Sequence, residues 1–320
     1  MRLSGKGIML IDPRIHTGRA LEILTIDADA IGQHKNKMGP HSNNTYATVQ
    51  TQFITATNGV KFAYRKLGER QDVPIIYFNH LTANMDNCDP RVMDGMATRH
   101  EIISFDYRGV GSTSGDDAKS IQDMAKDCIA FIKALGYSKV DILAFSMGGF
   151  IAQELMALEP TLVRKIVLAG TGPRGGKGVS AVVGLTYWDI VKGTFTGRDP
   201  KFYLFFTTTA NGKNAARLFL SRLKERTMDR DIPVRIRTLR AQLNAIRVWG
   251  HEQPADLSVF KLPVLVINGD NDRMVPTPNS YDMAKRFPNA KLHIYEEGAH
   301  GAVFQHHDDF VKRALAFFAA

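Results

Sequence analysis

A short apolar run that ends in a serine is the feature of this sequence that most constrains its fold. Residues 140–145 lead directly into Ser146, and an apolar helical pattern begins immediately after it. This arrangement predicts a sharp turn from a strand into a helix, with the serine hydroxyl exposed at the turn. The backbone in such a turn is crowded, which explains why the residues two before and two after the serine, Ala144 and Gly148, are small.

The helix expected after Ser146 favours a chemical role for this serine. Its first N–H groups have no partner within the helix, and they carry the positive end of the helix dipole. An oxyanion formed beside the serine could be stabilised there. A buried serine in an ordinary strand-to-helix turn would have the same short motif, so the motif alone leaves the function open.

Strand and helix patterns alternate over most of the chain. We expect strands at residues 49–56, 60–67, 74–79, 101–106, 140–145, 163–170, 262–268 and 291–295, and helices at 89–98, 120–135, 280–287 and 308–318. The first two strands flank Asn58-Gly59, a pair typical of a β-hairpin turn. The alternation predicts an α/β fold with a mostly parallel central sheet flanked by helices, whose site lies beyond the carboxyl ends of the strands.

Residues 172–260 interrupt this alternation after the sixth strand. A glycine-rich entry is followed by helix-like sequence with many aromatic residues, which predicts a mainly helical cap inserted into the core. The expected division is an N-terminal extension of unclear role at 1–48, a core at 49–171 and 261–320, and a cap at 172–260. Most cap aromatics should be buried, while Trp188 and Trp249 are candidates for substrate contact. The sequence leaves open whether Met38 is the biological start.

The composition is that of an ordinary globular protein, with 44% apolar and 23% charged residues. Two cysteines, Cys88 and Cys128, give no disulfide framework or metal cluster, and Cys128 falls on an apolar helical stripe. No apolar run approaches the roughly 20 residues of a membrane span, and no secretory leader is recognisable. We therefore expect a cytoplasmic protein without a membrane span.

The net charge of +9 comes mostly from one segment. Residues 171–260 contain 15 Lys and Arg against 7 Asp and Glu. Such a surplus can be a solvated face, a funnel for an anionic substrate or a surface for a polyanion. No nucleic-acid motif accompanies it, so we favour the solvated face and expect no nucleic-acid partner.

A serine hydroxyl is a weak nucleophile at neutral pH and needs a base, which in turn needs a partner that orients it. Asp272 and His300 each follow a predicted strand, and the order Ser, Asp, His along the chain suits side chains at strand ends of this kind of sheet. Asp270 is an alternative acid. Three further histidines are less suitable as the base, because they fall on the cap or at the start of the last helix: His251, His306 and His307.

The sequence resembles the α/β-hydrolase superfamily over about residues 50–320. Within it, the chain is similar to the compact capped group of esterases, enol-lactonases and cofactor-free haloperoxidase-like enzymes. The resemblance rests on Phe78-Asn79-His80-Leu81-Thr82, Asp106-Tyr107-Arg108-Gly109-Val110-Gly111-Ser112, Ala144-Phe145-Ser146-Met147-Gly148-Gly149, and Gly269-Asp270-Asn271-Asp272…Val275-Pro276 with Gly298-Ala299-His300-Gly301. These four segments occur in the order and spacing that the superfamily shows.

The resemblance implies Ser146 as nucleophile, Asp272 as acid and His300 as base. It also implies an oxyanion hole formed by the Met147 N–H and by an N–H in the loop after the first motif. The usual His-Gly of that loop is His80-Leu81 here, and we favour Thr82 over Leu81 as the donor. His80 itself is expected to shape this loop, and Arg108 to organise the loop beside the site. No metal or organic cofactor is required.

The predicted function is a serine hydrolase that cleaves a small-molecule carboxylic ester or lactone through an acyl-enzyme. One alternative is a hydrolase of a carboxylate-bearing enol-lactone or C–C ring-cleavage product, suggested by four cap arginines: Arg235, Arg237, Arg240 and Arg247. Perhydrolase or haloperoxidase-like activity and a ligand receptor on a hydrolase fold are the others. The sequence does not predict the physiological substrate or the oligomeric state.

Overall fold

A computed structural model of the chain describes residues 44–320. The predicted extension therefore lies mostly outside the described residues, and so does Met38. Residues 44–48, which the sequence assigned to the extension, are part of the fold. Tyr46 is buried, and its hydroxyl donates to the Met85 carbonyl at 2.9 Å and lies 2.7 Å from the Ser104 hydroxyl. One aromatic residue without a periodic neighbour gives no sequence signal for this packing.

The sheet has eight strands in the order β1-β2-β4-β3-β5-β6-β7-β8. Their bounds are β1 Gln52–Thr55, β2 Lys61–Leu67, β3 Ile75–Phe78, β4 Ile102–Phe105, β5 Val140–Phe145, β6 Val163–Ala169, β7 Val264–Gly269 and β8 Ala290–Tyr295. β2 pairs antiparallel with β1 and β4, and all pairs from β4 to β8 are parallel. The predicted α/β fold with a mostly parallel sheet is confirmed.

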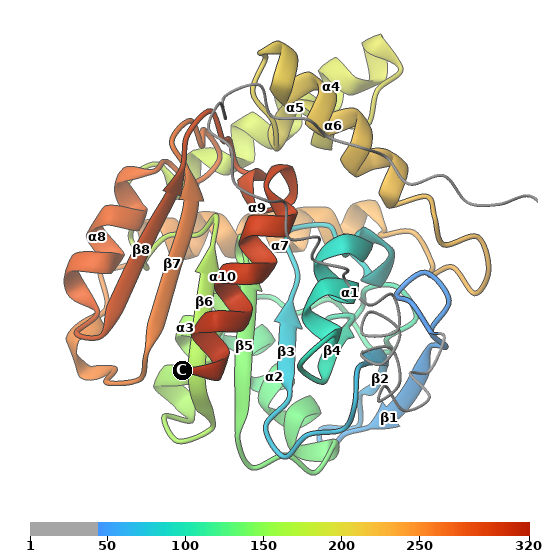
Figure 1. The fold of residues 1–320 in the computed structure, drawn as a ribbon, viewed down its shortest axis with the longest axis vertical. Coiled ribbons are helices and arrows are strands. Elements are labelled where there is room, and N and C mark those ends of the chain that lie inside the picture. Colours follow the sequence, from blue (N-terminus) through green and yellow to red (C-terminus); the bar gives the residue numbers. More distant parts are fainter. Residues whose placement is uncertain (1–43) are drawn as a thin grey trace, which may run out of the picture. The chain divides into compact units, whose positions relative to one another are not determined.

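Helices cover both faces of the sheet, with α1 and α10 on one face and α2 and α3 on the other (Figure 1). The α-helices of the core are α1 Pro90–Ala97, α2 Ile121–Ala134, α3 Met147–Leu158, α8 Pro278–Arg286, α9 Ala302–Gln305 and α10 His307–Ala319. A short 3₁₀ helix, η2 at Met85–Asn87, follows β3. Ser120 caps the start of α2, because its side chain accepts the Asp123 N–H at 3.0 Å.

The helices between β6 and β7 fall in the segment predicted as a cap. They are α4 Val182–Thr196, α5 Lys201–Leu204, α6 Ala210–Arg222 and α7 Ile236–His251, with 3₁₀ helices η3 Val179–Ala181 and η4 Leu257–Val259 at either side. In Figure 1, α4, α5 and α6 lie beyond the end of the sheet toward which the arrowheads of the parallel strands point. The cap segment therefore stands over the end where the candidate site is expected.

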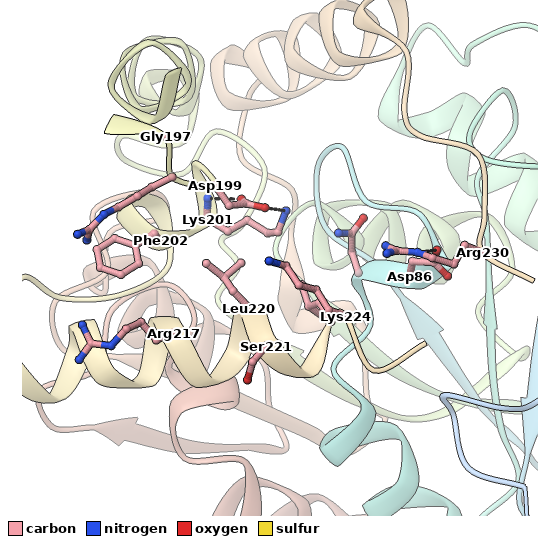
Figure 2. Close-up of a pocket in the computed structure, with 13 residues that line it drawn as sticks. Asp86, Gly197, Asp199, Lys201, Phe202, Arg217, Leu220, Ser221, Lys224 and Arg230 are labelled. Carbon is pink, nitrogen blue, oxygen red and sulfur yellow. Dashed lines mark hydrogen bonds and ion pairs between the residues drawn. The ribbon is translucent and has the colours of Figure 1, made fainter. Parts of the chain in front are cut away.

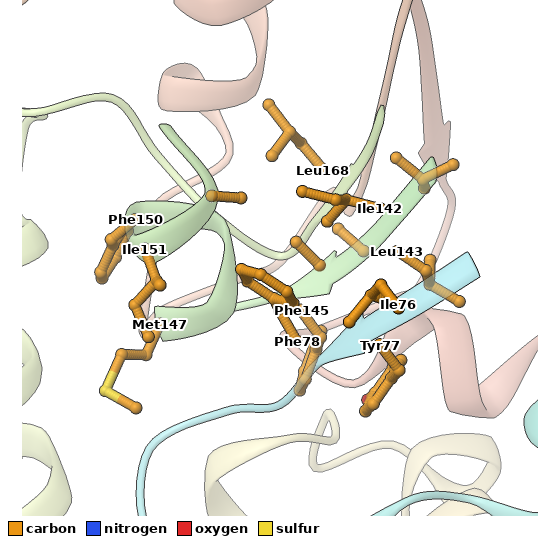
Figure 3. Packing of buried hydrophobic residues seen from close by; sticks show 14 of the residues in the cluster. Ile76, Tyr77, Phe78, Ile142, Leu143, Phe145, Met147, Phe150, Ile151 and Leu168 are labelled. Carbon is orange, nitrogen blue, oxygen red and sulfur yellow. The ribbon is translucent and has the colours of Figure 1, made fainter. Parts of the chain in front are cut away.

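The strands at the centre of the sheet are buried on both faces because helices cover each side. Every residue of β3, β5 and β7 is buried. Figure 3 shows Phe78, Phe145 and Phe150 packed around the end of β5 and the start of α3. Dense aromatic packing at this point holds the strand-to-helix turn that follows β5.

Ion pairs with buried carboxylates connect the cap segment to the core. Arg222 at the end of α6 binds Asp89, the N-cap residue of α1, with Nη2 2.6 Å from Oδ2. Asp189 of α4 is buried and pairs with Arg273, which is next to the candidate acid Asp272. Removing one partner of such a pair would leave a buried charge without compensation, so each contact ties the position of a cap helix to the core.

In residues 44–320 the structure contains no helix long and apolar enough to cross a membrane.

Candidate active site

Ser146 lies at the turn between β5 and α3 in a backbone conformation that serine rarely adopts, with φ +57° and ψ −120°. Its N–H donates to the Ala169 carbonyl at 2.9 Å. Gly148 passes very close to the neighbouring strand, since a Cβ there would lie 2.2 Å from the Phe78 carbonyl oxygen. The small residue expected after the serine is thus required by a backbone contact.

The structure brings Ser146, His300 and Asp272 together from three strand ends. His300 Nε2 lies 2.9 Å from Ser146 Oγ, and His300 Nδ1 lies 2.8 Å from Asp272 Oδ2. All three side chains are buried, and no more than 6% of any residue is exposed. The distances allow the imidazole to accept the serine proton while the carboxylate holds its other nitrogen.

Asp272 is oriented by its own loop. Its second oxygen, Oδ1, accepts the N–H groups of Met274 at 2.8 Å and Val275 at 3.0 Å. Asp270, the alternative acid, is exposed and instead accepts the Gly298 N–H at 3.1 Å. The geometry therefore favours Asp272 as the partner of the histidine.

A cap residue, Phe205, forms part of the wall around His300. The Phe205 ring centroid lies 5.4 Å from that of His300, and the Phe145 ring lies 5.0 Å from it on another side. The Phe205 carbonyl also accepts the Gly301 N–H at 2.7 Å, directly after the histidine. The cap segment thus packs against the candidate base, a contact that the sequence did not identify because Phe205 counted only as a cap aromatic.

The two N–H groups expected to form an oxyanion hole differ in their surroundings. The Met147 N–H, at the start of α3, donates to no group within the described part of the chain. Thr82 has φ +55°, which is strained for a β-branched residue, and its N–H donates to Oε1 of Gln242 at 2.8 Å. Gln242 is a buried residue of α7 in the cap segment.

Leu81, the other residue considered as the second oxyanion donor, is buried and contacts its neighbours through its carbonyl. This carbonyl accepts Thr82 Oγ1 at 2.7 Å and lies 2.7 Å from Nδ1 of His80. The His80 ring thus binds the carbonyl of the next residue, which agrees with the expected loop-shaping role. Arg108 Nε binds Asp127 of α2 at 2.8 Å, and the expectation that Arg108 organises its loop stays a prediction.

The two tryptophans expected to contact substrate lie elsewhere. Trp188 is 68% exposed on α4, where it belongs to an apolar stripe with Tyr187, Val191 and Phe195. Trp249 is buried and stacks on Phe150, with ring centroids 5.7 Å apart. Neither residue lines the two cavities described below. We therefore do not include them in the proposed substrate site.

A cavity of about 390 Å³ extends from the Thr82 loop between the core and the cap segment. Its walls include Leu204 of α5 and Leu239 of α7. Of the four cap arginines considered from the sequence, only Arg235 lines it, and its Nη2 donates to the Gly109 carbonyl at 2.8 Å. Arg237, Arg240 and Arg247 are exposed and line neither this cavity nor its neighbour.

Residues 44–320 contain no cluster of three or more His, Cys, Asp or Glu side chains that could hold a metal ion. The expectation that the protein uses no cofactor stays a prediction.

The sheet, the strained serine turn at the end of β5 and the hydrogen-bonded histidine together define an α/β fold of the hydrolase type. Residues 73–307 match the family described as the alpha/beta hydrolase fold, and the chain belongs to this family.

Similar proteins agree with this family. A putative esterase/lipase of Haemophilus influenzae is 25% identical, over 86% of this chain and 93% of its own. A 2-hydroxy-6-oxo-6-(2'-aminophenyl)hexa-2,4-dienoic acid hydrolase of Metapseudomonas resinovorans is also 25% identical, over 89% and 96%. The solved structure of an alpha/beta hydrolase fold protein from Chitinophaga pinensis superposes with a TM-score of 0.80 at 36% identity, covering 86% of this chain and 99% of that chain.

The buried His80 ring predicts a specific pH dependence of stability. Burial, with a smaller contribution from the charge of Lys201, lowers the pKa of His80 from 6.5 to about 3. Between these pH values the unfolded chain binds a proton that the folded chain does not. The stabilisation from this group is therefore complete above about pH 6.5 and decreases as the pH falls toward 3, by at most about 1.4 kcal/mol per pH unit.

We expect His80→Asn to reduce the slope of unfolding free energy against pH in this range. Urea unfolding of wild type and variant at a series of pH values, followed by circular dichroism, measures the slope. Above about pH 7 the plots of unfolding free energy against pH for wild type and variant should run parallel, because the imidazole is then neutral in both the folded and the unfolded chain. Equal slopes at acid pH would contradict the neutral buried state of His80.

Proposed function

We propose that the protein is a serine hydrolase that cleaves a carboxylic ester or lactone through an acyl-enzyme on Ser146. The observation that carries this proposal is the chain of two hydrogen bonds from Ser146 through His300 to Asp272, at 2.9 and 2.8 Å. The names of the similar proteins support hydrolysis, because they include a putative esterase/lipase and a hydrolase of a dienoic acid.

The proposed reaction begins when His300 Nε2 accepts the proton of Ser146 as its oxygen attacks the substrate carbonyl. Asp272 stabilises the imidazolium that forms. Collapse of the tetrahedral intermediate breaks the ester bond, and His300 returns the proton to the leaving alcohol. A water molecule then attacks the acyl-enzyme by the same route and releases the acid and the free serine.

The oxyanion of each intermediate would accept the Met147 and Thr82 N–H groups. The Thr82 N–H donates to Gln242 in the structure, so in this proposal the side-chain carbonyl of Gln242 takes the place that a substrate oxygen would occupy. We propose that substrate displaces this carbonyl as the oxyanion forms. The Thr82 backbone, with φ +55°, would keep the N–H directed at this place when substrate is bound.

The remaining expectations stay predictions. They are a small-molecule substrate without a nucleic-acid partner, a cytoplasmic location, and the alternatives of perhydrolysis or a receptor role.

The two free cysteines, Cys88 and Cys128, are both buried.

The esterase proposal is tested with p-nitrophenyl esters from acetate to palmitate. We expect wild-type activity to be highest at one acyl length, because the cavity next to Thr82, of about 390 Å³, provides apolar contacts for only a limited length of chain. Ser146→Ala should reduce kcat by at least about 10⁴-fold, since no other group in the proposed mechanism replaces the nucleophile.

Circular dichroism of both proteins controls for folding. A folded wild-type protein that hydrolyses every ester no faster than Ser146→Ala would refute the ester hydrolase proposal, and lactones would be tested next.

The contact between Gln242 and Thr82 is tested with two substitutions of similar size. Glu at position 242 presents an anionic acceptor to the Thr82 N–H and repels an oxyanion, so Gln242→Glu should lower kcat/KM by about 10²-fold or more, as loss of one oxyanion donor does. Gln242→Met has no acceptor to displace and should retain kcat/KM at or above the wild-type value.

Steady-state kinetics on the best p-nitrophenyl ester measure both effects. Equal losses in the two variants would mean that Gln242 holds the loop in place and does not compete for the oxyanion site.

A further inference from the structure

A second cavity, of about 580 Å³, opens beside the one that reaches Thr82. We call it the vestibule; its walls are the end of α6, the turn before α5, and the Asp86–Asn87 segment. Figure 2 shows Arg217 and Lys224 on the α6 side, and Asp199 and Lys201 on the opposite wall. The site proposed for catalysis does not include these residues.

Basic side chains outnumber acidic ones around the vestibule by five to two. The basic residues are Arg198, Lys201, Arg217, Lys224 and Arg230, and the acidic ones are Asp86 and Asp199. Both carboxylates are already engaged. Asp199 binds Lys201 at 3.0 Å, while Asp86 binds buried Arg65 at 2.8 Å and Arg230 at 3.3 Å.

Three of the basic residues have no carboxylate partner within the described residues: Arg198, Arg217 and Lys224. Arg198 lies over the Phe202 ring, 4.6 Å from its centroid. Arg217 and Lys224 are exposed at the vestibule wall. Residues 44–320 therefore leave the positive charge of these three side chains without a neutralising carboxylate, and this charge favours an anion.

The vestibule and the Thr82 cavity share part of their walls, including Asp199, Lys201 and Arg230. The charge of Lys201 also contributes to the lowered pKa of His80, so this ammonium group lies close enough to act on the loop beside the site. Apolar side chains of Phe202, Leu220 and Leu223 line the vestibule together with the basic groups. A ligand here would combine an apolar chain with an anionic end.

We propose that the vestibule binds a carboxylate carried by the substrate at the far end of an apolar chain from the ester that Ser146 attacks. This inference rests on the proposed function and names its substrate class: half-esters of linear dicarboxylic acids. Lys224 and Arg217 would bind the carboxylate, and the apolar wall would contact the chain. A polyanion on the outer basic surface is the competing explanation of the same charges.

The kinetic test uses p-nitrophenyl half-esters of dicarboxylic acids from glutarate to sebacate. Each is compared with the same compound methylated at its free carboxylate, which removes only the charge. We expect roughly a tenfold higher kcat/KM for the half-ester at the chain length that spans both cavities, corresponding to about 1.4 kcal/mol. Added salt should reduce this preference, because the basic groups are partly exposed.

Lys224→Met, alone or together with Arg217→Gln, should lower kcat/KM for the half-ester to that of its methylated counterpart. Lys213→Met is the matched control, since Lys213 is exposed on the same helix and does not line the vestibule. This control should behave as wild type. The opposite outcome is that heparin inhibits hydrolysis of the half-ester, and that Lys213→Met weakens the binding of heparin and half-ester as much as Lys224→Met does. The charges would then act as a general basic surface, and the proposal would be wrong.

A binding measurement separates this proposal from the proposed function. Monomethyl suberate is titrated by calorimetry into Ser146→Ala protein with and without Lys224→Met. If Lys224→Met weakens binding to the Ser146→Ala protein by roughly tenfold, the result supports carboxylate binding in the vestibule even if no ester is hydrolysed. Absence of binding, or equal binding in both proteins, overturns the vestibule even if neutral esters are cleaved.

Discussion

The backbone conformation of Ser146 is the constraint on which the rest of the site depends. A positive φ at a residue with a side chain costs about 1–3 kcal/mol and persists only where surrounding contacts enforce it. Here the Ser146 N–H is held by the Ala169 carbonyl, and Gly148 lies against the Phe78 carbonyl. These contacts direct the serine hydroxyl toward His300 and place the first N–H of α3 beside it.

The cap segment takes part in this geometry as well as covering it. Phe205 packs against His300 and binds the next N–H, and Gln242 accepts the N–H of Thr82. Arg273, the neighbour of Asp272, pairs with buried Asp189 of α4. A movement of the cap segment would therefore change its contacts to the loops that carry Thr82, Asp272 and His300. The position of the cap segment would in this way connect the entry of substrate with activity.

The sequence predicted the parts that have a local signal. The strands, the serine turn and the loops of Asp272 and His300 follow from apolar patterns and short motifs, and the structure brings these side chains together. The Thr82–Gln242 contact joins residues 160 positions apart and leaves no trace in either segment. The basic surplus of the cap segment was visible in the sequence, but which arginines line a cavity depends on how each helix is rotated against the core. Arg235 lines the Thr82 cavity, whereas Arg217, which lines the vestibule, was not among the four arginines chosen from the sequence.

Covalent labelling shows whether Ser146 is an activated nucleophile. The folded protein is treated with a fluorophosphonate, and the labelled residue is identified by mass spectrometry of peptides. We expect one adduct, on Ser146, that is absent from Ser146→Ala and forms much more slowly in His300→Ala. An unlabelled wild-type protein, or equal labelling of Ser146→Ala, would contradict this expectation.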